Sequence, residues 1–159
     1  MAADHEYRIT VEWRGNRGTG TSGVRDFSRV HEVRADGKPP LAGSADPNLR
    51  GDADRWNPEE LLVAALSQCH MLWFLHLAAL AGVVVTDYTD AAAGTMVMER
   101  TGAGQFTKVV LRPVVAVTDQ AMCPEVPELH EKAGQMCFIA RSVNFPVECE
   151  AHVRVAAQA

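Results

Sequence analysis

The sequence predicts an α+β fold of order β-β-α-β-β-α-β, built as one domain over residues 1–159. Stretches near both ends of the chain alternate apolar and polar residues, which is the period-two pattern of strands with one buried face. Two helical segments separate those stretches, and one of them contains a run of 25 residues without a formal charge. The chain is 47% apolar and 22% charged, which is ordinary for a globular protein with one core.

The N-terminal third is predicted to hold two strands and a long loop. Residues 7–13 alternate strictly, and residues 27–33 follow as a second strand after a glycine-rich turn. Residues 36–56 are rich in proline, glycine and aspartate. Loops of about twenty residues in compact domains are usually functional or disordered, so this loop is a candidate functional segment.

The uncharged run, residues 61–85, predicts a long central helix that is buried on every side. Asn57 can cap its start, Pro58 suits the first helical position, and Glu60 completes a capping box. Gly82 is expected to end the helix. One chain of this size can barely cover such a helix while burying its other elements, so we expect a homodimer to supply the missing wall.

The C-terminal half is predicted to hold a hairpin, a helix and a closing strand. Residues 95–99 and 105–117 are separated by a short turn and form the hairpin. Residues 127–142 predict an amphipathic helix with Cys137 near its middle. Residues 147–155 alternate again and predict the last strand.

Charge and polarity argue against several classes of protein. Acidic residues flank the apolar run and polar residues interrupt its centre, which argues against a membrane span. The N-terminus lacks the basic start and apolar stretch of a secretory signal, so we expect a cytoplasmic protein with reduced cysteines. A net charge of −5 without a basic stripe argues against nucleic acid as a partner.

Cys69 and Cys137 are the candidate reactive residues, because each lies in the middle of a predicted helix in apolar surroundings. Both can be small core residues, and the alternative is a thiol pair that cycles to a disulfide. A reactive thiolate needs a nearby cation, and the dipole of the helix fades long before Cys69. An arginine from another segment must therefore stabilise the anion. The candidates weighed among the arginines on the N-terminal side are Arg14, Arg17, Arg50 and Arg55.

Glu59 is a candidate to hold that arginine, although it also lies where plain helix capping would place an acid. Glu59 and Cys69 are ten residues apart, or about 15 Å along a helix axis. Either the arginine spans this gap within one chain, or the second subunit of a dimer completes the site.

No metal ion or cofactor is expected. The residues Cys123, His130, Cys137 and Cys149 lack the C-x2–4-C or H-x3–5-H spacing of zinc sites. The glycine-rich turn near the start does not follow a P-loop pattern and does not open a helix. Cys123 and Cys149 are therefore interpreted as cysteines without a chemical role.

The segment NPEELLVAALSQC, residues 57–69, resembles the NPEEL…AAxxxC signature of the OsmC/Ohr family of thiol peroxidases. Cys137 lies 68 residues after Cys69, where that family has its second cysteine, and the WRG…G…G strand and turn near the start also match. The resemblance covers most of the chain. It implies an OsmC-like fold and an intertwined, cytoplasmic homodimer, with two metal-free active sites at the subunit interface.

The resemblance also implies a role for each candidate residue. Cys69 matches the peroxidatic cysteine and Cys137 the resolving cysteine. Glu59 would orient the arginine, Arg50 best matches the OsmC-type arginine, and Arg17 is the alternative from the N-terminal strands. The implied substrate is an organic hydroperoxide or hydrogen peroxide, and the implied reductant is a dithiol, such as a lipoylated protein or a small thiol.

Two functions remain open from the sequence. The first is a two-cysteine hydroperoxide reductase in oxidative-stress defence, and the second is a non-catalytic dimer of the same fold that binds a hydrophobic small molecule. The chain departs from the family pattern at His70, where phenylalanine is usual, and after Cys137, where CFIARSVNFP replaces CPVS. Because neighbours on a helix face different ways, His70 is interpreted as a core histidine rather than a residue that tunes Cys69.

Overall fold

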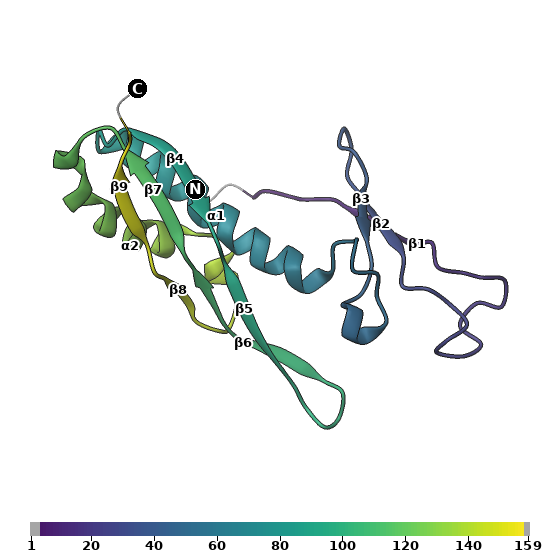
Figure 1. Cartoon of the computed structure of the whole chain (residues 1–159). Helices are drawn as coiled ribbons and strands as arrows, with labels where there is room; N and C mark the ends of the chain where they lie inside the picture. The colour runs from purple at the N-terminus through teal and green to yellow at the C-terminus, as the bar shows by residue number, and fades with distance from the viewer. Residues whose placement is uncertain (1–3, 158–159) are drawn as a thin grey trace. The chain divides into compact units, whose positions relative to one another are not determined.

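The computed structural model describes residues 4–157, which divide after Leu61 into two compact units (Figure 1). The N-terminal unit contains an antiparallel sheet of order β1-β2-β3. Its strands are β1 (Thr10–Trp13), β2 (His31–Arg34) and β3 (Leu41–Gly43). The short 3-10 helix η1 (Pro47–Leu49) follows, and the division between the units runs through the first turn of the long helix α1.

The structure corrects two predictions for the N-terminal unit. The predicted loop over residues 36–56 contains β3 and η1, because Leu41 and Ala42 pair with β2 in a strand too short to show an alternating pattern. The predicted buried face of the first strand is exposed, since Tyr7 and Ile9 are 87% and 62% accessible. Within the described part of this unit the sheet is a single layer, so no second layer covers that face.

Helix α1 (Pro58–Leu80) begins and ends where the sequence predicts. The Asn57 side-chain oxygen accepts the Glu60 N–H at 2.8 Å, and the Glu60 carboxylate accepts the Asn57 N–H at 3.3 Å. This reciprocal pair is a capping box. At the other end Gly82 has φ +74°, a left-handed conformation that glycine adopts without strain, and the Val83 N–H reaches back to the Ala78 carbonyl at 2.9 Å.

Only one face of α1 is buried within the single chain, and burial on every side, which the sequence predicts with a second subunit, stays a prediction. The buried residues recur every four positions and are Leu66, His70, Phe74 and Ala78. Leu72 and Leu80 are 60% and 73% exposed. By length and composition alone α1 could also cross a membrane, a test that the core helices of soluble proteins pass as well. Its buried face packs against protein side chains.

Six strands of the C-terminal unit form two mixed sheets. Each sheet has one antiparallel and one parallel pair of strands, and the parallel pairs have the same register in both sheets. The strands are β4 (Val85–Asp90), β5 (Ala93–Met98), β6 (Gly104–Leu111), β7 (Pro113–Val117), β8 (Val147–Cys149) and β9 (His152–Val155). The sheet orders are β5-β6-β8 and β4-β7-β9. Val109 faces Val147 in one sheet and Val114 faces His152 in the other, so the same offset continues across the break. The two sheets are thus halves of one three-stranded sheet.

The break lies at Arg112, which interrupts the strand predicted over residues 105–117. The Arg112 N–H donates to the Asp90 carboxylate at 2.6 Å, and its guanidinium donates to Glu150 at 2.9 Å. These side chains take the place of ladder hydrogen bonds at the kink. The β5–β6 hairpin is confirmed, the closing strand is divided into β8 and β9, and β4 was not predicted.

The second helix is shorter than predicted. Helix α2 (Val126–Met136) follows the 3-10 helix η2 (Gln120–Glu125), and a separate 3-10 turn η3 (Ala140–Ser142) comes after it. Cys137 is the C-cap of α2, with ψ +112°, and not a mid-helix residue. The sequence Cys-Phe-Ile after Met136 consists of weak helix formers, which favours this early end.

Two clusters of buried residues join α1 to the sheet and to α2. The first contains Phe74, Ala78, Val83, Val115, Val117, Val126, Leu129 and Ala133, and the second contains Leu66, Val109 and Leu111. Valine predominates on the sheet side, as expected for residues that pack between a helix and a pleated surface. These contacts fix the rotation of α1 about its axis, and with it the direction in which Cys69 and His70 project.

Replacement of the helix cap should destabilise the protein measurably. We expect Asn57→Ala to lower the free energy of unfolding by about 1 kcal/mol, because the Glu60 N–H loses its side-chain acceptor at a buried position. Urea denaturation followed by circular dichroism measures this change. Asn48→Ala, at an exposed asparagine of η1, is the matched control, and an equal loss in both variants would contradict the role of the cap.

Candidate functional site

The two predicted cysteines come together in the C-terminal unit. Cys69 lies on α1 and is half-buried, whereas Cys137 at the end of α2 is buried, and both are free thiols. The Cys69 thiol lies near enough to Cys137 to contribute to the rise in the pKa of Cys137. Two neighbouring thiols can form a disulfide where their Cα atoms come within about 7 Å of one another.

The surroundings of Cys137 favour its neutral form. Burial raises the pKa of Cys137, and the adjacent Cys69 thiol adds to the rise. The Ala140 N–H donates to the Cys137 sulfur at 3.4 Å and opposes the shift only in part. Cys137 is therefore a protonated thiol at neutral pH, and the less buried Cys69 is the more accessible sulfur of the pair.

Trp73 and Phe138, which are close in sequence to the two cysteines, form an aromatic pair. Trp73 follows Cys69 by one helical turn on the same face of α1, and Phe138 follows Cys137 directly. The rings of Trp73 and Phe138 meet edge to face with centroids 5.4 Å apart, and Phe138 is 65% exposed. The thiol pair thus has an exposed apolar neighbour.

The N-terminal unit places Glu59 in a cavity of about 290 Å³ that it shares with Arg29. One carboxylate oxygen of Glu59 is buried without a hydrogen-bond partner in the part of the chain that the structure describes. The Arg29 guanidinium lies 4.3 Å from the centroid of the Phe27 ring and donates to the Phe27 carbonyl at 3.0 Å. Sequence reasoning missed Arg29, because it lies within a predicted strand and far from Glu59 in the chain.

The predicted arginines lie elsewhere in this unit. Arg50 is exposed and has φ +67°, which is in the left-handed region. Among the described residues, no other residue except glycine has a positive φ. Such strained positions cluster at functional sites. Arg17 is exposed, and Arg55 forms an ion pair with Asp52 at 3.9 Å. Glu59 therefore shares its cavity with Arg29 and not with Arg50, Arg17 or Arg55.

The loop that carries Arg50 is closely fitted to its neighbours. The Arg50 N–H donates to the Pro47 carbonyl at 3.1 Å and caps η1. A Cβ atom on Gly51 would lie 1.5 Å from the Ala45 carbonyl oxygen, so only glycine fits at that position. Local backbone contacts thus set the conformation of the loop and the direction in which the Arg50 side chain leaves the backbone.

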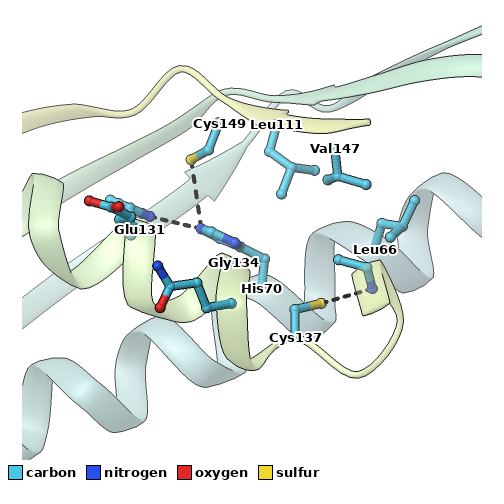
Figure 2. A pocket seen from close by; sticks show the side chains of 11 residues that line it. Leu66, His70, Leu111, Glu131, Gly134, Cys137, Val147 and Cys149 are labelled. Atoms are coloured by element: carbon cyan, nitrogen blue, oxygen red, sulfur yellow. Dashed lines mark hydrogen bonds between the residues drawn. The ribbon is translucent and has the colours of Figure 1, made fainter. Parts of the chain in front are cut away.

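A second cluster of polar groups lies in a cavity of about 320 Å³ in the C-terminal unit (Figure 2). His70 Nε2 is 2.9 Å from His130 Nδ1, and the Cys149 sulfur is 3.7 Å from the same nitrogen of His70. Figure 2 shows Cys149 approaching His70 from the strand, with Cys137 at the other side of the cavity. The interpretation of His70 as a buried core histidine is confirmed, since it is 2% exposed and hydrogen-bonded.

Burial keeps this cluster uncharged near neutral pH. It lowers the pKa of His130 to about 4, with a smaller contribution from His70. It also lowers the pKa of His70, an effect that Asp90 partly opposes. Although Cys149 is exposed as a residue, its sulfur faces His70, and burial together with Asp90 and Glu150 raises the pKa of Cys149 to about 11.

A family model described as OsmC-like protein matches residues 51–152. An OsmC-like protein of unknown function from Vibrio cholerae has a solved structure that is 34% identical to this chain and has a TM-score of 0.84. The match covers 93% of this chain and 99% of that one. The Bacillus subtilis protein YmaD, described as uncharacterized, is 23% identical over 96% of this chain and 97% of its own.

The fold is also shared with a more distant solved structure. An organic hydroperoxide resistance protein from Elizabethkingia anophelis, with thiocyanate bound, has a TM-score of 0.68 at 20% identity. The match covers 97% of this chain and 100% of that chain. The predicted α+β, OsmC-like fold class is therefore confirmed.

The buried histidine pair should make stability depend on pH. Because the pKa of His130 falls from 6.5 in the unfolded chain to about 4 in the fold, the unfolded state binds more protons between these values. We expect the free energy of unfolding to fall by up to about 3 kcal/mol as pH falls from 6.5 through 4. Urea unfolding at a series of pH values measures the slope. His130→Gln should reduce it, and an unchanged slope would contradict the assignment.

Proposed function

This chain belongs to the OsmC-like protein family, and from that premise we propose that it is a thiol-dependent peroxidase that reduces organic hydroperoxides. The observation that carries the proposal is that the Cys69 thiol of α1 lies near the Cys137 thiol at the end of α2, close enough to affect its pKa. The name of the related Elizabethkingia protein, organic hydroperoxide resistance protein, agrees with this substrate class. The proposed setting is the cytoplasm, in defence against oxidative stress.

The proposed reaction uses both sulfurs in turn. The Cys69 thiolate attacks one oxygen of the hydroperoxide, the O–O bond breaks, and the other oxygen leaves as an alcohol after taking up a proton. Cys69 becomes a sulfenic acid. The Cys137 sulfur then attacks the Cys69 sulfur, water leaves, and a disulfide remains. A dithiol reductant, such as a lipoylated protein, returns both cysteines to thiols and is itself oxidised to a disulfide.

The difference between the two thiols supports these roles. Cys137 is buried, and the direction of its pKa shift keeps it protonated at neutral pH. Since the thiolate is the nucleophile, Cys137 is poorly suited to the first attack. Cys69 is the more accessible sulfur and is therefore proposed as the peroxidatic cysteine, with Cys137 as the resolving cysteine.

The cation that stabilises the Cys69 thiolate is proposed to be an arginine positioned by Glu59. A planar guanidinium can stabilise the thiolate and also the oxygen that leaves the peroxide. Arg50 is supported by the family resemblance and by its left-handed backbone. Arg29 is supported by the cavity it shares with the unpartnered carboxylate oxygen of Glu59.

A homodimer is part of the proposal. The uncovered face of α1 contains Leu72 and Leu80, and the exposed side of β1 contains Val11 and Trp13. Large apolar side chains exposed on two elements of one chain are typical of an interface with a second copy. We propose that this second copy covers them.

The exposed Phe138 and its partner Trp73 favour an organic substrate over hydrogen peroxide. Their rings offer an apolar surface next to the thiol pair along the chain. An alkyl or aryl group on the peroxide gains free energy from such a surface, whereas hydrogen peroxide has no apolar part to bury.

A non-catalytic function is the second candidate, because one observation favours it. The cavity of about 320 Å³ in the C-terminal unit is lined partly by Leu66, Leu111 and Val147. This volume lies at the lower end of the range for small-molecule sites. The protein would then bind a hydrophobic metabolite without turning over peroxide.

Removal of either thiol should separate the two functions. With cumene hydroperoxide and a dithiol reductant, we expect turnover in the wild-type protein and its loss in Cys69→Ser, because the nucleophile is gone. Cys137→Ser should form the sulfenic acid once and then stop, since no resolving thiol is present. Peroxide loss and trapping of the sulfenic acid by dimedone measure these steps. Undiminished peroxide consumption by Cys69→Ser would refute the peroxidase proposal.

The two candidate arginines can be compared directly. Alkylation of Cys69 by iodoacetamide at pH 7 is measured in Arg50→Ala and in Arg29→Ala. We expect the variant that removes the activating cation to react at least about tenfold more slowly. Cys137→Ser serves as the background, so that only Cys69 of the pair is alkylated. Arg100→Ala, at an exposed arginine in the β5–β6 turn, is the matched control. If neither variant alters the rate relative to this control, the proposed arginine is wrong.

A further inference from the structure

The cavity of the C-terminal unit brings together three potential metal ligands from three separate elements. His70 comes from α1, His130 from α2 and Cys149 from β8. One ligand atom from each residue lies within 4.8 Å of the other two. In Figure 2 the sulfur of Cys149 and the ring of His70 point toward one another across the cavity.

We propose that His70, His130 and Cys149 bind one zinc ion, with a water molecule from the cavity as the fourth ligand. Two imidazoles and one thiolate are ligands that zinc prefers, and three protein ligands with one open position occur at zinc sites. The three ligands are distinct from the proposed peroxidase thiols, although Cys137 lines the other side of the same cavity, and Cys69 projects about 100° away from His70 on the helix.

The distances between the ligand atoms are close to those that a tetrahedral ion needs. Zinc bonds of about 2.0 Å to nitrogen and 2.3 Å to sulfur place two nitrogens about 3.3 Å apart and a nitrogen and a sulfur about 3.6 Å apart. The corresponding distances here are 2.9 Å between the His70 and His130 nitrogens and 3.7 Å between His70 and the Cys149 sulfur. Small rotations of the two imidazoles would therefore admit the ion.

The histidine pair is not explained by packing alone. Both rings are nearly fully buried, and they are parallel within 4°. Nε2 of His130 has no hydrogen-bond partner among the described residues. A neutral imidazole carries one proton, and placing it on Nε2 leaves the lone pair of Nδ1, the nitrogen that faces His70, for an ion.

The protonation states of the three residues suit a metal ion. Zinc binds the neutral imidazole, and both rings are nearly fully buried, which favours the neutral form. The Cys149 thiol is protonated in the absence of an ion. Binding therefore forms a sulfur–zinc bond, breaks the S–H bond and releases one proton to solvent, with no change of oxidation state.

The experiment uses the full chain carrying Cys69→Ser and Cys137→Ser, so that the proposed peroxidase thiols cannot bind the ion. After treatment with a chelator, the protein is titrated with Zn²⁺ by calorimetry and with Co²⁺ by absorption spectroscopy. We expect one equivalent of either ion to bind. Co²⁺ should give a thiolate-to-metal charge-transfer band in the near ultraviolet, which reports a cysteine ligand directly.

The matched variants distinguish the ligands from other residues. Adding Cys149→Ser should abolish the charge-transfer band and weaken Zn²⁺ binding by at least about tenfold, and His130→Gln should weaken binding similarly. Cys123→Ser, at a cysteine outside the cluster, should leave both signals unchanged. Because Cys149 is exposed, its serine variant is expected to fold, and circular dichroism checks this.

Two results would overturn the zinc site. One is the absence of Zn²⁺ binding in the protein that retains Cys149, and the other is undiminished binding after Cys149→Ser. Neither result bears on the peroxidase proposal, which is tested with the thiols that this experiment removes.

Discussion

The burial of one face of α1 against the sheet is the constraint on which both candidate sites depend. Leu66 and Phe74 are fully buried, and together they fix the rotation of the helix about its axis. Deleting a buried aromatic or leucine side chain from such a core typically costs about 2–5 kcal/mol, which is a large share of the stability of a small domain. With this rotation fixed, Cys69 lies near Cys137, and His70 contacts His130 at 2.9 Å. One apolar helix thus directs two adjacent polar residues to two different clusters.

The C-terminal unit favours neutral side chains. Burial moves the pKa values of His70 and His130 down and those of Cys137 and Cys149 up, so each of these groups is driven toward its uncharged form. A catalytic thiolate works against that tendency and requires a positive charge held at fixed geometry. This requirement is the physical reason for assigning a role to an arginine and to the buried carboxylate of Glu59. It also explains why cysteines in the same unit can serve different purposes.

Much of the fold follows from local signals in the sequence. The capping box at Asn57 and Glu60, the terminating Gly82 and the β5–β6 hairpin depend on residues within a few positions of one another, and all are confirmed. The division of the predicted strand at Arg112 was not predictable, because the groups that bond to it, Asp90 and Glu150, are distant in sequence. The early end of α2 depends on weak helix propensities after Met136, which a periodic apolar pattern conceals.

By itself the sequence determined the family, the two reactive cysteine candidates and the start of the helix that carries Cys69. These conclusions rest on contiguous residues and on spacing along one chain. Only the tertiary structure decided that Glu59 shares a cavity with Arg29, and that His70 lies beside His130 and Cys149. The reason is physical. Ligand-type and catalytic groups converge from elements that are remote in sequence, and their meeting is set by how helices and strands pack, which spacing along the chain does not encode.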